Sequence, residues 1–112
     1  MNLTCQERDG ALVASVSGPI DHENADAFQA SLLPAVGQAA AAEARLILDL
    51  HDVDYMSSVG LRVLMRALNE ARAKSVGLVV ADLNGTMREI FEISRFDKLL
   101  EVFDSVEDAL SG

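Results

Sequence analysis

The chain has 112 residues, half of them hydrophobic, and its 18 acidic and nine basic residues give a formal net charge of -9. This length and hydrophobic content predict one domain, residues 1–112, that buries a single core. The acidic balance argues against nucleic-acid binding, which relies on Lys and Arg to neutralise phosphates.

The single cysteine, Cys5, excludes an intramolecular disulfide and a four-cysteine zinc site. On an expected first strand, we interpret it as a small packed hydrophobic residue rather than a reactive thiol. No run approaches the roughly 18 apolar residues of a membrane helix, and the N-terminal residues lack the basic start and apolar run of a signal peptide. We therefore expect a soluble, cytoplasmic protein that does not contact a membrane.

The first elements predicted are a β-hairpin and a helix. Two β-prone runs, 3–7 and 12–17, flank Asp9-Gly10, a strong hairpin turn signal. The Ala-, Leu- and Gln-rich stretch 23–42 predicts a helix. Within it, Pro34 predicts a kink or short break, because proline cannot donate to the carbonyl four residues back.

After the first helix, the pattern alternates strands and helices. Three short apolar runs have the length of buried strands: 45–50, 78–81 and 99–103. Amphipathic stretches at 61–74 and 86–94 predict helices that pack on the sheet, and Asp104 or Ser105 is expected to cap a short C-terminal helix. This order predicts an α/β fold with a mixed, mostly parallel sheet of about five strands and about four helices.

Ser57 and Ser58 lie where a buried strand gives way to an amphipathic helix, the edge at which ligands collect in open α/β sheets. Their hydroxyls are expected at a helix N-terminus, where free backbone N–H groups favour a negative group such as a phosphoryl group. The alternative is that one of the serines only caps the helix.

A catalytic serine is the weakest of the alternatives. The nucleophile elbow has the pattern G-x-S-x-G, and this chain has Met56 in place of the first glycine. Only His22 and His51 could act as a histidine base. The ligand-type residues beside them, Asp21 and Glu23 next to His22 and Asp52 next to His51, are adjacent in the sequence and lack the i, i+4 spacing that would align them on a helix. No metal or other cofactor is therefore expected. We therefore expect no enzymatic activity.

Several motifs resemble the STAS domain of bacterial anti-sigma factor antagonists, over essentially the whole chain. They are Gly18-Pro19-Ile20-Asp21, Leu48-Asp49-Leu50, Val53-Asp54-Tyr55-Met56-Ser57-Ser58-Val59-Gly60-Leu61, Phe91-Glu92-Ile93-Ser94 and Phe96-Asp97-Lys98-Leu99. The family's central motif reads approximately F-M-D-S-S/T-G-L, with the phosphorylated serine directly after the Asp, so the matching position is Ser58. Two positions differ from the motif, because Ser57 replaces the Asp and Val59 replaces the second hydroxyl residue.

The resemblance implies partner switching. The unphosphorylated protein is expected to bind an anti-sigma factor that is also an ATP-dependent serine kinase; phosphorylation of Ser58 ends this interaction, and a metal-dependent serine phosphatase restores it. The expected partner-binding face consists of Asp21, His22, Ser57, Ser58, Val59 and Arg62. The free protein is expected to be a monomer.

The competing hypothesis is a STAS scaffold without phosphorylation. Such a protein binds its partners constitutively, uses the serines only as caps and controls a client other than a sigma factor.

Overall fold

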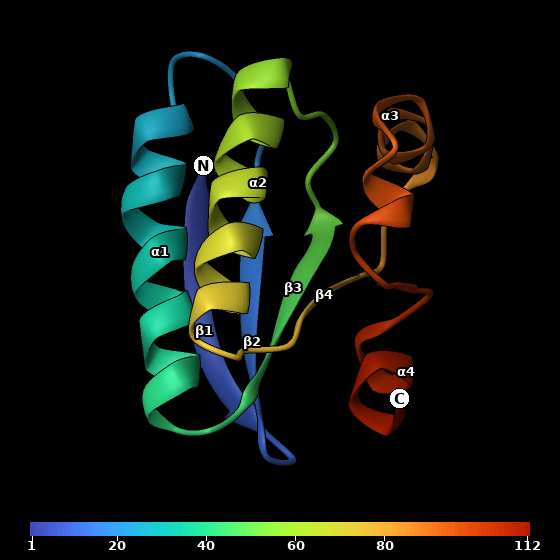
Figure 1. Cartoon of the computed structure of the whole chain (residues 1–112). Helices are drawn as coiled ribbons and strands as arrows, with labels where there is room; N and C mark the ends of the chain where they lie inside the picture. The colour runs from blue at the N-terminus through green and yellow to red at the C-terminus, as the bar shows by residue number, and fades with distance from the viewer.

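The computed structural model describes all 112 residues of the chain and is shown in Figure 1. Its strands are β1 (Asn2–Arg8), β2 (Ala11–Ser17), β3 (Arg45–Asp52), β4 (Leu78–Ala81) and β5 (Val102–Phe103). Its helices are α1 (Ala25–Ala41), α2 (Ser58–Ala73), α3 (Gly85–Ser94) and α4 (Val106–Ser111), with a 3-10 helix at Phe96–Lys98.

The strands form one mixed sheet in the order β1-β2-β3-β4-β5. β1 and β2 are antiparallel, and the three later pairs are parallel. The hairpin between β1 and β2 turns at Asp9 and Gly10, whose φ angles of 49° and 80° are the positive values that a two-residue hairpin turn requires. The predicted α/β class, sheet type and hairpin are confirmed.

The sheet is covered unequally on its two faces. α1 and α2 lie side by side across one face, while α3 and α4 lie toward the β4 side (Figure 1). The main core, a cluster of 28 buried residues, includes the sheet residues that face α1 and α2. A smaller cluster of seven buried residues lies on the other face, beneath α4. There the Arg45 guanidinium donates to the Ala109 carbonyl at 2.6 Å and so satisfies a carbonyl near the end of α4.

Two predicted elements need correction. α1 continues across Pro34 without a break, because Pro34 and Ala30 are both exposed and water can replace the missing hydrogen bond to the Ala30 carbonyl. The last strand is shorter than the predicted 99–103, because the Leu99 and Leu100 N–H groups both donate to the Phe96 carbonyl, at 3.0 and 2.9 Å, and so belong to the preceding turn. Of the two residues expected to cap the C-terminal helix, Ser105 does so, because its hydroxyl oxygen accepts a hydrogen bond from the Asp108 N–H at 3.0 Å.

Cys5 lies on β1 as predicted, but its side chain is exposed rather than packed. β1 is the edge strand of the sheet, and five of its seven residues are exposed. The helices therefore cover little of this strand, which is why the interpretation of Cys5 as a packed residue is wrong. Partial desolvation still raises the pKa of the thiol, so little of the reactive thiolate is present at neutral pH.

No helix in the structure has both the length and the apolar character needed to span a membrane.

Candidate functional site

The loops before α1 and α2 are joined at the edge of the sheet where β2 and β3 end, at the top of Figure 1. Ile20 and Met56 form an isolated parallel bridge. The Ile20 N–H donates to the Tyr55 carbonyl at 2.9 Å, and the Ser57 N–H donates to the Ile20 carbonyl at 2.8 Å. Because the Ile20 and Met56 side chains are both buried, the bridge anchors the two loops to the core. It also brings the segment that contains Asp21 next to the two serines.

The two serines have different surroundings. Ser57 is the N-cap of α2, in an extended conformation (φ -76°, ψ 173°), and its hydroxyl oxygen accepts a hydrogen bond from the Gly60 N–H at 3.4 Å. Ser58 is the first residue of the helix, it is exposed, and its hydroxyl has no hydrogen-bond partner within the chain. The capping alternative therefore applies to Ser57, and the Ser58 hydroxyl is left accessible to another molecule.

Asp21 organises the loop that lies beside the serines. Its carboxylate oxygen Oδ1 accepts a hydrogen bond from the Glu23 N–H at 2.9 Å, while its own N–H donates to Asn24 Oδ1 at 2.9 Å. Asn24 Nδ2 in turn donates to the Pro19 carbonyl at 2.7 Å. These bonds hold the chain in a turn through residue 24, so α1 begins later than the predicted residue 23.

All the predicted site residues lie on this edge or just below it: Asp21, His22, Ser57, Ser58, Val59 and Arg62. Val59 is half-buried and packs against the core, whereas His22 and Arg62 are exposed. Ser58 and Arg62 are one turn apart on α2. The bridge brings the Asp21 loop to the serines, although no hydrogen bond or ion pair joins Asp21 or His22 to either serine.

Gly60 belongs to the motif 53–61 that resembles the STAS family, but the sequence alone assigns it no structural role. A Cβ atom built at Gly60 lies 2.6 Å from Met56 Cγ and 2.8 Å from Ile20 Cγ2, closer than real side chains approach. Only glycine therefore allows α2 to pack this tightly against the bridge. The signal for it in the sequence is its place in that motif, directly before the predicted helix 61–74.

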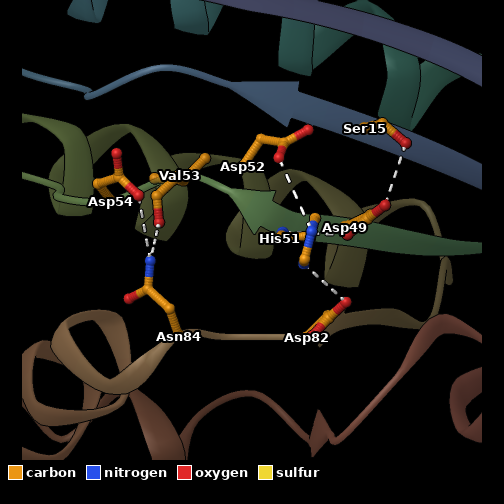
Figure 2. Close-up of polar contacts among 8 residues, drawn as sticks. All are labelled: Ser15, Asp49, His51, Asp52, Val53, Asp54, Asp82 and Asn84. Atoms are coloured by element: carbon orange, nitrogen blue, oxygen red, sulfur yellow. Dashed lines mark hydrogen bonds and ion pairs between the residues drawn. The ribbon is translucent and has the colours of Figure 1, made fainter.

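Asn84, which stands shortly before the predicted helix 86–94, is a second residue to which the sequence alone assigns no role. Its Nδ2 donates to the Val53 carbonyl at 3.0 Å and to Asp54 Oδ1 at 3.5 Å, as Figure 2 shows. Its Oδ1 accepts a hydrogen bond from the Met87 N–H at 2.9 Å and so caps α3. One amide side chain thus holds the start of α3 and the loop that leads to the serines.

Replacing Asn84 with alanine is expected to lower the free energy of unfolding by about 1–2 kcal/mol, because α3 loses its cap and the Val53 carbonyl loses its donor. Asn84→Asp keeps a capping oxygen but not the amide donor, so its loss should be intermediate. The matched control is Asn69→Ala, at an exposed position of α2, which should change stability by less than about 0.5 kcal/mol. Urea unfolding measures all three, and equal stability of the two alanine variants would refute this role.

Two carboxylates lie close to the ring of His51, near the end of β3 (Figure 2). His51 Nδ1 lies 3.2 Å from Asp82 Oδ2, and His51 Nε2 lies 3.9 Å from Asp52 Oδ1. Nearby, the Ser15 hydroxyl donates to Asp49 Oδ2 at 3.3 Å. No three such groups are arranged to hold a metal ion. The His51 ring is therefore directed at these carboxylates and not at Ser57 or Ser58.

Comparison with known proteins shows which family this chain belongs to. The STAS domain model matches residues 2–109. BtrV of Bordetella bronchiseptica is 38% identical over 112 residues, which cover 100% of this chain and 94% of BtrV. The anti-sigma-F factor antagonist RsfB of Mycobacterium tuberculosis is 31% identical over 113 residues, which cover 100% of this chain and 88% of RsfB.

Among solved structures, an anti-sigma factor antagonist from Mycobacterium paratuberculosis is 27% identical, with a TM-score of 0.80, and the match covers 98% of this chain and 91% of that one. The sequence match and the shared fold thus both extend over nearly the full length of the chain. The chain belongs to the STAS domain family, and its homologues and structural neighbours include proteins named as anti-sigma factor antagonists.

Proposed function

We propose that this protein is an anti-sigma factor antagonist that works as a phosphorylation-controlled partner switch in the cytoplasm. Its unphosphorylated form binds, as a monomer, an anti-sigma factor that is also an ATP-dependent serine kinase. Phosphorylation of Ser58 releases the partner, and a metal-dependent serine phosphatase restores the binding form. The protein has no catalytic activity of its own.

The observation that carries this proposal is the contrast between the two serines. Ser57 uses its hydroxyl to cap α2, whereas the Ser58 hydroxyl is exposed and has no partner within the chain. A kinase can therefore reach Ser58 Oγ without opening a hydrogen bond. In the transfer, the γ-phosphoryl group of ATP forms a bond to Ser58 Oγ as its bond to ADP breaks, and the hydroxyl proton passes to a base of the kinase.

Ser57 replaces the Asp of the family motif, and the structure gives a reason why the fold tolerates this change. Serine and aspartate are both good N-caps, because each has an oxygen that accepts a hydrogen bond from the first turn. The substitution keeps the cap and removes a negative charge beside Ser58. We propose that Asp21, on the adjoining loop, is the acidic residue that the kinase meets near Ser58, and that His22, Val59 and Arg62 belong to the same partner-binding face.

The missing aspartate also favours a second candidate function. A STAS scaffold that is never phosphorylated would bind its partner constitutively and could control a client other than a sigma factor. In that protein, the exposed hydroxyl of Ser58 has no regulatory role.

Intact-mass analysis separates the two candidates. The purified protein is incubated with Mg-ATP and an ATPase-type serine kinase from the same organism, after binding between the two has been established. Wild type and Ser57→Ala are expected to gain one phosphate, and Ser58→Ala none. A bound kinase that leaves the wild type unmodified would support the scaffold instead, and a phosphate on Ser58→Ala would mean that the acceptor is wrongly assigned.

A further inference from the structure

Arg62 is an unpaired cation in a protein with a net charge of -9. Arg8, Lys74 and Arg88 each lie within 4 Å of a carboxylate, at distances of 3.7, 3.4 and 2.9 Å. Arg62 is exposed and has neither an ion pair nor a hydrogen bond within the chain. Its guanidinium is therefore free to bind a negative group that arrives near α2.

The position of Arg62 on α2 places it beside Ser58. Residues four apart on a helix have Cβ atoms about 5–6 Å from each other. A negative group at the earlier position and a positive group at the later one is the favourable order for such a pair. A phosphate on Ser58, the first residue of α2, also complements the positive end of the helix dipole. The next arginine, Arg66, is a full turn further from Ser58 and already donates to Gln29 Oε1 at 3.2 Å.

We propose that Arg62 is the internal ligand of the phosphate on Ser58. This inference rests on the proposed function, since it requires Ser58 to be phosphorylated. An arginine can donate two parallel, charge-assisted hydrogen bonds to a phosphate, and the exposed side chain of Arg62 has no hydrogen bond or ion pair to break first.

The consequence is that phosphorylation changes the partner-binding face in two ways. It adds a doubly charged group at Ser58, and it draws the Arg62 guanidinium away from the partner into an intramolecular ion pair. Arg62 is thus a positioning residue of the switch. It contributes to the partner surface in one state and holds the phosphate in the other.

The test uses phosphoserine incorporated at position 58 during translation, so neither the kinase nor the partner is needed. Phosphorus NMR gives the second pKa of the phosphate. Replacing Arg62 with glutamine should raise this pKa by about 0.5, because the variant loses an i, i+4 ion pair that favours the doubly charged form of the phosphate. High salt should reduce the difference between the two proteins.

The controls isolate the contribution of Arg62. Arg66→Gln removes the same charge one turn further on and should leave the phosphate pKa unchanged, whereas Arg62→Lys should restore part of the lowering. The other charged or titratable groups at this edge are Asp21, His22 and Glu23 on the loop before α1, Asp26 in the first turn of α1 and Asp54 on the loop before α2. They are present in every variant and cancel in the comparison.

A second measurement links the ion pair to the switch. The factor by which phosphoserine weakens binding to the kinase should be smaller in Arg62→Gln than in Arg66→Gln, because the first variant has already lost the guanidinium that the phosphate withdraws. An identical phosphate pKa with and without Arg62 would overturn this inference and leave the proposed function standing. A kinase that never modifies Ser58 would contradict the proposed function and leave the titration result intact.

Discussion

Phosphoserine at position 58 is expected to weaken binding to the kinase partner by about 100-fold or more relative to serine, which corresponds to about 2.8 kcal/mol. The neutral, exposed hydroxyl at the start of α2 becomes a group with about 1.5 to 2 negative charges. A partner surface shaped for a hydroxyl must then desolvate that charge or face it with a like charge. A complete change in occupancy needs about 5 kcal/mol, so a phosphate near the centre of the interface provides a large share.

Titration calorimetry with the purified kinase measures this loss. Phosphoserine at Ser75, just beyond the opposite end of α2, adds the same charge away from the proposed face and should change the affinity by less than about threefold. Ser58→Ala should still bind. Ser58→Glu should bind less well than wild type but better than the phosphoprotein, because a carboxylate has a smaller charge. Equal weakening by phosphoserine at 58 and at 75 would mean that net charge, and not the site, controls binding.

The variant Gly60→Ala is expected to lose about 2 kcal/mol of stability, although alanine is the better helix former by about 1 kcal/mol. The added Cβ overlaps Met56 Cγ at 2.6 Å and Ile20 Cγ2 at 2.8 Å. Both side chains are buried and belong to the bridge between the two loops, so neither can move without disturbing the core. Partner binding should weaken together with stability, because the bridge positions Ser58 relative to Asp21.

Gly37 in the middle of α1 provides the matched control. A Cβ at this position meets no atom within 4 Å, so Gly37→Ala should stabilise the protein by about 0.5–1 kcal/mol. Urea unfolding of the two variants therefore compares the same chemical change in a crowded and an open position. Stabilisation of both would show that the overlap at Gly60 is relieved without cost, and would contradict the structural role assigned to this glycine.

The fold was largely predictable because its signals are local. The Asp9-Gly10 turn, the apolar run at 45–50 and the alternation of strands with amphipathic helices each depend on neighbouring residues. Two predictions, for Pro34 and for Cys5, were wrong because they depend on how exposed the side chain is to water. Pro34 is tolerated because it faces water, and Cys5 is exposed because β1 is an edge strand. Neither residue's surroundings can be inferred from residues adjacent to it in the sequence.

The place of the two serines in the fold could be predicted from the sequence, whereas the contacts around them could not. The resemblance to the STAS family indicated Ser58, and the strand-to-helix transition placed both serines at a helix start. The bridge between Ile20 and Met56, however, joins segments 36 residues apart, and the Asn84 amide reaches back 31 residues to the Val53 carbonyl. Such long-range hydrogen bonds have no periodic signature in the sequence, so the structure was needed to find them.

Displacement of the client from its anti-sigma factor tests the partner switch most directly. The complex of the anti-sigma factor with its fluorescently labelled client is titrated with the serine and phosphoserine-58 forms of this protein, and client release is followed by anisotropy. The account predicts that the serine form releases the client and that the phosphoserine form does not. Equal release by both forms, or release by neither, would contradict it.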